Sequence, residues 1–377
     1  MPPHKLPLRV LSVLGTRPEG IKMAPVIRAF AARPEHFTSL VCVTGQHREM
    51  LDQVMRDFSL KADVDLNLMR AGQTPAEVAS RVLAAMPEVL RDTRADLVVV
   101  KGDTTTTMAA ALAAFMQGVP VAHVEAGLRT DDIRQPFPEE MNRRVASIVT
   151  TLHFPPTVGA RDALLREGVP ADVIEVTGNT VVDALLQSRR PDYRFTVPAL
   201  AALQPDRRVV LVTLHRRESF GAPMRAVCAA LRRVAERHPE LTFVLPVHRN
   251  PSVREVVLPM LEGCANILLI EPLDYLDFIH LMARSHLIVT DSGGVQEEAP
   301  SLDVPVLVTR EVTERPEGVD VGAARLVGTD ETLIENTVEE LLGDPVAYRT
   351  MASAPNPYGD GKASERIVAA VQRWACG

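Results

Sequence analysis

Short apolar runs rich in β-branched residues alternate with helical patterns along the chain. The first five runs are RVLSVLG (9–15), SLVCVTG (39–45), DLVVVKGD (96–103), VPVAHVEAG (119–127) and DVIEVTGN (172–179). Helical patterns near 17–32, 75–91, 104–117 and 157–167 lie between them. Continuous apolar strands that alternate with helices are typical of a parallel sheet covered on both faces. These segments therefore predict a doubly wound α/β domain.

The alternation stops at 188–206 and then restarts. The stretch SRRPDYRFTVPALAALQPD has three prolines and no clear periodicity, so we interpret 188–206 as a linker. Five further strand-like runs follow it: RRVVLVTLH (207–215), LTFVLPVH (241–248), NILLIEPL (266–273), HLIVTDSGG (286–294) and VPVLVTR (304–310). The expected fold class is α/β, with two Rossmann-like doubly wound domains and a cleft between them. The expected domains span 1–187 and 207–364, with a last helix, 365–377, that packs back on the first.

Composition excludes several classes of protein. The net charge of the 377 residues is −7, which argues against a nucleic-acid or anionic membrane partner. Aromatic residues make up only 4%, so a base-stacking surface is not expected. The four cysteines are scattered without CxxC spacing, which indicates neither a metal site nor a disulfide framework. No apolar run approaches membrane-spanning length, and the N-terminal run is typical of a strand, so we expect a cytoplasmic protein.

Ligands of open parallel α/β sheets bind beyond the carboxyl ends of the strands. The stretch TDSGGVQEEA (290–299) follows a strand and opens a helix, where Gly293 and Gly294 would let the backbone approach a diphosphate. Ser292 adds a hydroxyl donor, and Glu298 suits a ribose diol. The alternative interpretation is a capped helix with a tight turn.

A second candidate anion site follows the first strand. In GTRPEGIKMAP, Arg17 and Lys22 lie at the start of a helix, where cations oppose the helix dipole unless an anion binds there. Two solvated bases are the alternative. The chain has neither GxGxxG nor GxxxxGK[ST], so the NAD and P-loop interpretations lack their main support.

Acidic residues end two runs of the first domain. Asp103 follows 96–100 and Glu125 follows 119–124, so the two lie on one edge if these strands are neighbours. Paired carboxylates raise one another's pKa, which suits acid–base chemistry. The alternative role for Asp103 is a helix cap. Glu139, which begins a helix in the acid-rich stretch 123–144, can also point inward, whereas Asp131, Asp132 and Glu140 are expected to be solvated or paired with arginines.

Three residues of the second domain complete the candidates. His215 ends a strand and is followed by two arginines, which favour its neutral form unless phosphate binds. Arg315 lies in a loop after a strand and suits a bidentate phosphate contact. Phe278 can pack on a uracil ring, although a helix-core position is the alternative.

Together these stretches resemble the non-hydrolysing UDP-N-acetylglucosamine 2-epimerases. The resemblance spans about residues 8–375 and includes, in the order of that family, GTRPEGIKMAP, TGQHREML, GDTTTT, HVEAGLRT, PFPEEMNR, TGNTVVDAL, HRRESFG, TDSGGVQEEAPSL, TERPE and NPYGDG. It implies a glycosyltransferase B-like fold, a homodimer and no metal or cofactor.

The resemblance also implies roles for individual residues. Catalysis is expected from Asp103, Glu125 and Glu139, and UDP binding or leaving-group stabilisation from His215. The expected contacts with UDP are Arg17, Lys22, Phe278, Ser292, Gly293, Gly294, Glu298 and Arg315. Gln46 and His248 match parts of a second, activating UDP-N-acetylglucosamine site.

The implied reaction is reversible epimerisation at C2 of UDP-N-acetylglucosamine. Its target C–H bond is not next to a carbonyl, so UDP must leave C1 before C2 becomes acidic, which gives a 2-acetamidoglucal intermediate. Three alternatives remain open: a retaining UDP-sugar glycosyltransferase, a hydrolysing 2-epimerase and a non-catalytic sugar-nucleotide sensor.

Overall fold

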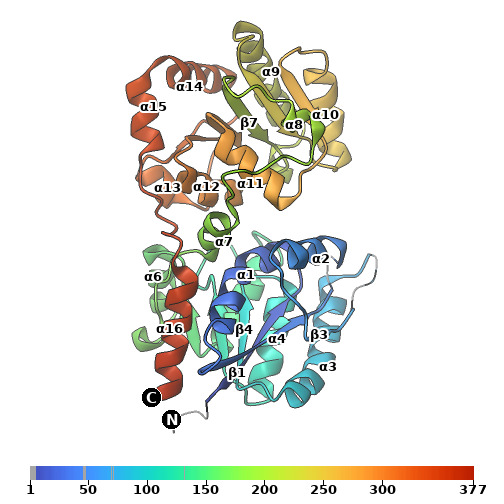
Figure 1. Cartoon of the computed structure of the whole chain (residues 1–377), viewed down its shortest axis with the longest axis vertical. Coiled ribbons are helices and arrows are strands. Elements are labelled where there is room, and N and C mark those ends of the chain that lie inside the picture. The colour runs from blue at the N-terminus through green and yellow to red at the C-terminus, as the bar shows by residue number, and fades with distance from the viewer. Residues whose placement is uncertain (1–5, 46–47, 69, 71, 131) are drawn as a thin grey trace. The chain divides into compact units, whose positions relative to one another are not determined.

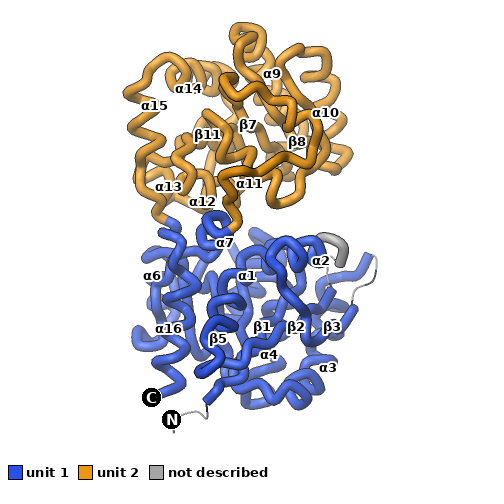
Figure 2. The backbone as a smooth tube through the Cα atoms, in the orientation of Figure 1, with its two compact units in different colours: residues 1–187, 358–377 blue, residues 188–357 orange. Residues whose placement is uncertain are grey.

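A computed structural model describes residues 6–45, 48–68, 70, 72–130 and 132–377 of the chain. The chain divides into two compact units (Figure 2). Unit 1 comprises residues 1–187 and 358–377, and unit 2 comprises residues 188–357. Unit 1 is therefore built from both ends of the sequence, and unit 2 from one continuous segment.

Unit 1 contains a six-stranded parallel sheet with helices on both faces (Figure 1). The strands lie in the order β3-β2-β1-β4-β5-β6. Their bounds are β1 Leu8–Leu14, β2 Phe37–Val43, β3 Val64–Asp65, β4 Leu97–Lys101, β5 Val121–Val124 and β6 Leu152–Phe154. The helices are α1 Arg17–Ala31, α2 Arg48–Asp57, α3 Pro75–Thr93, α4 Thr105–Met116, α5 Glu139–Val149, α6 Val158–Arg166, η1 Ala171–Val173, α7 Thr180–Ser188 and α16 Ala363–Cys376.

The first strand shows why its sequence is apolar at almost every position. Leu8, Val10 and Leu14 pack into a cluster with residues of α1 and α16. Leu11 and Val13, which point to the other face, pack into a separate cluster with α3 and α4. Because successive side chains of a strand point to opposite faces, a sheet with two covered faces needs apolar residues on both.

Unit 2 repeats this topology. Its strands lie in the order β12-β11-β10-β7-β8-β9, and every neighbouring pair is parallel. Their bounds are β7 Val209–Thr213, β8 Thr242–Pro246, β9 Ile267–Ile270, β10 Leu287–Thr290, β11 Val306–Val308 and β12 Ala324–Leu326. The helices are α8 Pro198–Ala201, η2 Arg217–Ser219, α9 Ala222–Arg237, α10 Pro251–Leu261, α11 Tyr275–Arg284, α12 Gly293–Glu298, η3 Ala299–Leu302, α13 Pro316–Asp320, α14 Glu331–Gly343 and α15 Pro345–Ala352.

Both sheets have the 3-2-1-4-5-6 order of the Rossmann fold, which confirms the predicted fold class of two Rossmann-like domains. The strand order reverses between β1 and β4 in unit 1 and between β7 and β10 in unit 2. In such sheets the loops after these central strands form the ligand-binding edge. The ligand-binding edge of each unit is therefore expected at the loops after these central strands, which contain the polar motifs of the sequence.

Three expectations about elements and boundaries are wrong. The run 172–179 is not a strand: η1 occupies Ala171–Val173, and only Ile174 makes an isolated bridge, to His153. The sixth strand is instead β6, whose three residues are too few to show a period. The segment 188–206 belongs to unit 2 rather than to a free linker, because Asp277 accepts hydrogen bonds from the Tyr193 hydroxyl and the Thr196 N–H. The return to unit 1 begins at 358 and not at 365.

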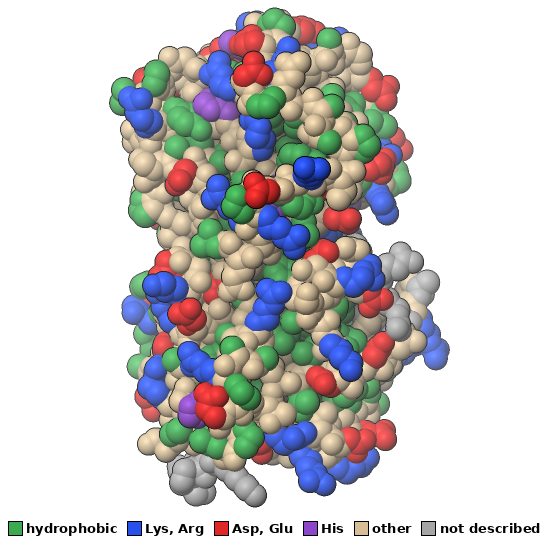
Figure 3. Space-filling view, viewed as in Figure 1, with side chains coloured by type: hydrophobic (Ala, Val, Ile, Leu, Met, Phe, Trp, Pro, Cys, Tyr) green, Lys and Arg blue, Asp and Glu red, His purple; other side chains and the backbone are tan. Residues whose placement is uncertain are grey.

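The surface charges and the helix lengths can be compared with the expectations from composition. Acidic and basic side chains lie interspersed on the face of the molecule drawn in Figure 3. Among the described residues, no helix combines the length and the apolarity that a membrane crossing requires.

The stability of unit 1 should depend on a cap that joins α7 to α16. The buried Asp183 carboxylate accepts hydrogen bonds from the backbone N–H groups of Ala363 (3.1 Å) and Ser364 (2.8 Å) and from the Ser364 hydroxyl (2.5 Å). Asp183→Ala leaves these buried donors without their acceptor and should lower the free energy of unfolding by about 1–3 kcal/mol. Urea denaturation followed by the fluorescence of Trp374, the single tryptophan of the chain, reports on α16.

The control for this cap is Asp360→Ala. Asp360 makes an exposed ion pair with Arg366, 2.7 Å between Oδ2 and Nη2, and such pairs contribute about 1 kcal/mol or less. Equal losses in the two variants would show that Asp183 does not hold α16.

Part of the loss of stability of unit 1 at acid pH should arise from His123 in β5. Burial lowers the pKa of His123 to about 3, although the hydrogen bond from Nε2 to the Gly102 carbonyl (2.7 Å) acts in the opposite direction. In the unfolded chain this histidine binds a proton near the ordinary histidine pKa of 6.5, so the free energy of unfolding should fall as pH drops from about 6.5 towards 3. His123→Gln should flatten this slope by about 1.4 kcal/mol per pH unit.

The same Trp374 fluorescence measures this slope in urea titrations at several pH values. His238→Gln in unit 2 is the control, because Glu339 and Glu240 raise the pKa of His238 against the effect of burial, and its loss should not flatten the slope. An unchanged slope in His123→Gln would exclude His123 as the source.

Candidate functional site

A buried carboxylate connects the two central loops of unit 1. Glu19 Oε2 accepts hydrogen bonds from the backbone N–H groups of Gly15 (2.9 Å) and Thr16 (2.7 Å) after β1. Its Oε1 accepts from the hydroxyls of Thr104 (2.7 Å) and Thr107 (2.9 Å) after β4. Glu19 is fully buried, so these bonds fix the loops GTRPE and GDTTTT against each other.

The same edge of unit 1 contains a cavity of about 640 Å³. Lys101, Asp103, Glu139 and Asn142 are among its lining residues. Strands β4 and β5 pair in parallel with Lys101 opposite Val124, which confirms that Asp103 and Glu125 follow neighbouring strands. Two of the three predicted catalytic acids, Asp103 and Glu139, therefore lie at one cavity.

Glu125 lies between two lysines. Its Oε2 is 2.6 Å from Lys22 Nζ, and its Oε1 is 3.1 Å from Lys101 Nζ. The backbone of Glu125 has φ of 61°, a left-handed conformation that costs a residue with a Cβ free energy and that often marks a functional site. The structure thus gives Lys22, predicted as a phosphate ligand, a carboxylate partner within its own unit.

Asp103 also has a cationic partner. Arg143 Nη2 lies 2.8 Å from Asp103 Oδ2, and the Asn142 side chain donates to the Asp103 carbonyl (2.9 Å). Asp103 and Glu125 are thus each paired with a cation. The sequence predicted two carboxylates near each other, but it did not predict these cations. Glu140 is fully buried and paired with Arg144, so of the two roles expected for it, pairing is the one observed.

Sequence reasoning missed several residues of this edge, although a signal existed for some of them. Lys101 stands directly before the Gly-Asp pair at a strand end. Arg143 follows Glu139 by four positions, so both share one face of α5. Nothing in the spacing indicated that Glu19 would join two loops, because Thr104 and Thr107 are distant in sequence.

The central loops of unit 2 are joined by Asp291. Its Oδ2 accepts hydrogen bonds from the backbone N–H groups of His215 (2.8 Å) and Arg216 (2.9 Å), and its Oδ1 lies 3.1 Å from His215 Nδ1. Burial alone would raise the pKa of Asp291, but these hydrogen bonds and the charge of His215 hold it below its usual value. Asp291 therefore stays ionised and orients the predicted catalytic histidine, a role that sequence reasoning missed.

His248 lies beside His215. The two imidazole rings stack with centroids 5.8 Å apart and planes 26° apart. Burial, and then the proximity of His215, lower the pKa of His248. The structure therefore places His248 at the ligand-binding edge of unit 2. Gln46, predicted with it as part of an activating site, lies outside the described residues.

The start of α12 brings several predicted UDP contacts together. Ser292 is the N-cap residue, and its side chain makes no capping bond. A Cβ on Gly293 would lie 2.9 Å from Arg315 Cζ, so only glycine lets the guanidinium lie this close. A Cβ on Gly294 would lie 3.9 Å from Ser292 Oγ and 4.0 Å from Glu298 Oε2.

The Arg315 side chain is held in place by acids. Its Nε donates to Glu297 Oε1 (3.0 Å), and its Nη1 donates to Glu314 Oε2 (2.8 Å). Glu297 is nearly fully buried and was not predicted. The other predicted contacts lie elsewhere: Arg17 is the first residue of α1, and Phe278 is half-buried on α11, which packs against β7 and η3.

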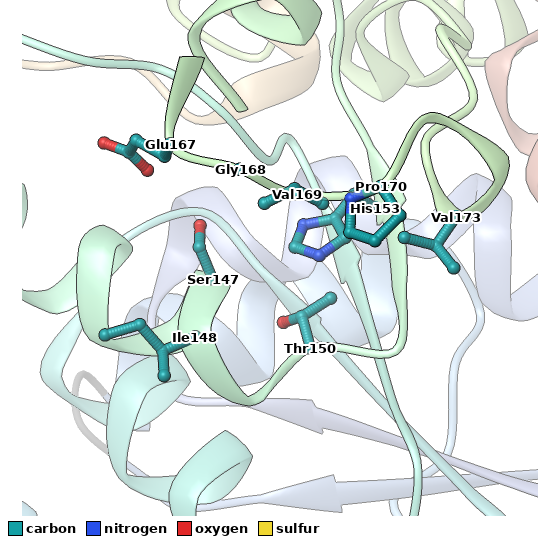
Figure 4. Close-up of a pocket in the computed structure, with 9 residues that line it drawn as sticks. All are labelled: Ser147, Ile148, Thr150, His153, Glu167, Gly168, Val169, Pro170 and Val173. Carbon is teal, nitrogen blue, oxygen red and sulfur yellow. The ribbon is translucent and has the colours of Figure 1, made fainter. Parts of the chain in front are cut away.

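A second cavity of unit 1, of about 330 Å³, lies at the start of β6 (Figure 4). Ile148, Val169 and Val173 give it an apolar lining, and burial lowers the pKa of its His153 to about 4. It borders the amino end of the strand, whereas ligands of such sheets bind at the carboxyl ends. The cavity with Asp103 and Glu139 is therefore the better candidate.

Comparisons with a family model and with known proteins all point to the same family. A family described as "UDP-N-acetylglucosamine 2-epimerase" matches residues 28–372. A "Probable UDP-N-acetylglucosamine 2-epimerase" of Ralstonia solanacearum is 52% identical over 372 residues, which cover 97% of this chain and 99% of that protein. The "UDP-N-acetylglucosamine 2-epimerase" of Escherichia coli K12 is 50% identical over 374 residues, covering 97% and 98%.

A solved structure gives the same result. The UDP-GlcNAc 2-epimerase from Neisseria meningitidis, bound to UDP-GlcNAc, superposes with a TM-score of 0.89 at 45% identity and covers 97% of this chain and 100% of that one. These matches extend over both units and over nearly the full length of each relative. The chain therefore belongs to the UDP-N-acetylglucosamine 2-epimerase family of isomerases.

Proposed function

We propose that this protein interconverts UDP-N-acetylglucosamine and UDP-N-acetylmannosamine by elimination and re-addition of UDP. Membership of the epimerase family and the UDP-GlcNAc bound to the Neisseria relative support the substrate. The observation that carries the proposal is the cavity at the carboxyl edge of unit 1 in which Asp103 and Glu139 both lie. Inversion at C2 needs one group to remove a proton and another to return it from the opposite face.

The order of bond changes follows from the substrate. The C2–H bond is not adjacent to a carbonyl, so no enolate can stabilise a carbanion there. The C1–O bond breaks first, and its electron pair leaves with the diphosphate. The sugar then has oxocarbenium character, which makes the C2 proton acidic. Its loss to a carboxylate forms the C1=C2 double bond of 2-acetamidoglucal.

The return step gives the epimer. A carboxyl group delivers a proton to the other face of C2 while a diphosphate oxygen re-forms the bond to C1. We assign the two proton transfers to the group formed by Asp103, Glu125 and Glu139, with Asp103 and Glu139 best placed at the cavity. Fixed charges aimed at developing charge are typical of such stabilisation.

Unit 2 supplies the groups for the leaving UDP in this proposal. Arg315 provides a planar cation suited to phosphate oxygens, and Ser292, Gly293 and Gly294 offer hydroxyl and backbone donors beside it. His215 can donate to the diphosphate, and Asp291, with Oδ1 3.1 Å from His215 Nδ1, orients the ring for that contact. Glu298 and Phe278 are assigned to the ribose and the uracil.

Solvent exchange at C2 tests the reaction. In D₂O, NMR should show deuterium entering C2 of UDP-N-acetylglucosamine together with the appearance of the manno epimer. Asp103→Asn and Glu139→Gln should each lower kcat and this exchange by about 10²- to 10⁴-fold, because each removes a proton-transfer group. Asp132→Asn is the control, since Asp132 is exposed in the same acid-rich stretch.

The rival functions give different outcomes in the same experiment. A retaining glycosyltransferase would leave C2 unlabelled, and a hydrolysing epimerase would accumulate free UDP irreversibly in a coupled assay. A non-catalytic sensor would show neither labelling nor turnover. Unchanged rates in both acid variants would remove Asp103 and Glu139 from the mechanism.

The contact between Gly293 and Arg315 predicts a second result. Gly293→Ala should push the guanidinium away from its contacts with Glu297 and Glu314 without unfolding unit 2. The affinity for UDP, measured by calorimetry, should fall by about tenfold to a hundredfold, as it should in Arg315→Met, because a charge-assisted hydrogen bond is lost. In the double variant the two losses should add only in part, because both substitutions remove the Arg315 contact with UDP.

Gly294→Ala distinguishes a steric effect on UDP from a steric effect on the protein. Its Cβ would meet no atom of the protein nearer than 3.9 Å, so any loss of affinity there reports the close approach of UDP itself. Additive losses for Gly293→Ala and Arg315→Met would contradict the displacement of Arg315.

A further inference from the structure

Lys101 joins a buried acid to the cavity of unit 1. It is the last residue of β4, and its side chain is only 8% exposed. Its Nζ lies 3.1 Å from Glu125 Oε1, and the residue also lines the cavity with Asp103 and Glu139. Lys22, from α1, reaches the other oxygen of Glu125 at 2.6 Å. Each oxygen of this carboxylate thus has an ammonium group from a different element.

We propose that Lys101 is a positioning residue that, together with Lys22, keeps Glu125 ionised throughout the reaction. This inference rests on the proposed function and narrows it, because a permanently ionised Glu125 cannot supply a proton. The two proton transfers at C2 then fall to Asp103 and Glu139. Glu125 acts as a fixed anion that holds the two ammonium groups in place.

The charge balance of the cluster supports this assignment. Protonation of Glu125 would remove the negative charge that lies between the ammonium groups of Lys22 and Lys101, and breaking a buried ion pair is strongly unfavourable. Opposite charges within about 4–6 Å favour the ionised form of an acid. The Glu125 side chain is 6% exposed, so water screens these attractions little.

Among the described residues, other charged or titratable groups of this region lie in β5, in the loop after β4 and in α5. His123, two residues earlier in β5, is fully buried, and burial lowers its pKa to about 3, so it is neutral in the working range. Asp103 is paired with Arg143 of α5 at 2.8 Å. Glu139 lines the cavity from the start of α5.

The backbone of Glu125 is consistent with a fixed role. Its φ of 61° is unfavourable for a residue with a Cβ, and the N–H donates to the Phe154 carbonyl of β6 at 3.0 Å. Such a conformation persists only where the surroundings determine it. The neighbouring strand and the two lysines together determine the position of this carboxylate.

The pH dependence of turnover tests the proposal. Lys101→Met should move the acid limb of the kcat profile to higher pH by about one unit, because Glu125 then protonates more easily. Activity should therefore fall more at pH 5–6 than at the alkaline plateau, a difference that a purely structural role would not give. Lys101→Arg, which keeps the charge, should restore the profile, and Lys61→Met, at an exposed lysine, should leave it unchanged.

A measurement without turnover completes the test. With ¹³C in the side-chain carboxyl groups of glutamate, the Glu125 resonance is identified by its loss in Glu125→Gln. Its titration midpoint should rise by about one pH unit in Lys101→Met, and in Lys101→Gln if the Met variant does not fold. Equal midpoints in wild type and variants, or an acid limb that does not move, would overturn the proposal.

The two proposals fail in different ways. Absence of C2 labelling in the wild-type protein would remove the proposed reaction, and with it the role of Lys101 in that reaction. Normal C2 labelling with an unmoved Glu125 midpoint would leave the reaction intact and exclude Lys101 as the group that keeps Glu125 ionised.

Discussion

One buried carboxylate at each switch in strand order holds the loops on which the candidate chemistry depends. Glu19 in unit 1 and Asp291 in unit 2 are both fully buried. Each accepts backbone N–H groups from the loop after the first strand of its sheet, and Glu19 also accepts threonine hydroxyls from the loop after the fourth. A parallel sheet brings such loops near one another, but it does not fix them. The two acids do so, and neither acts on the substrate in the reaction proposed.

The remaining acids of unit 1 differ in the charges that they face. Asp103 has an arginine, Glu125 has two lysines, and Glu139 lies at the cavity at the start of α5. Environments that differ in this way give carboxyl groups different proton affinities. For these three acids, which look equivalent in the sequence, we therefore propose one fixed anion, Glu125, and two proton-transfer groups, Asp103 and Glu139.

The architecture was largely predictable, because β-branched runs and helical periods reflect burial on both faces of a sheet. The predicted helices at 17–32 and 75–91 coincide closely with α1 and α3. The strand β6 was not predicted, because a run of three residues is too short to show a periodic pattern. The candidate acids were predicted from their places after strands, but their partners were not. Lys101, Asp291 and Glu297 become functional candidates only through contacts between distant segments, which no local pattern encodes.

The place of α16 in the chain has a consequence for synthesis. Its residues Ile367, Val368 and Val371 complete the apolar cluster on β1 and α1, yet they are translated after every residue of unit 2. A nascent chain emerging from the ribosome can therefore finish the later unit before α16 covers the flank of the earlier unit against which it packs. The earlier unit can therefore be completed last, and the apolar flank beside α1 is the part of its core that waits for the end of translation.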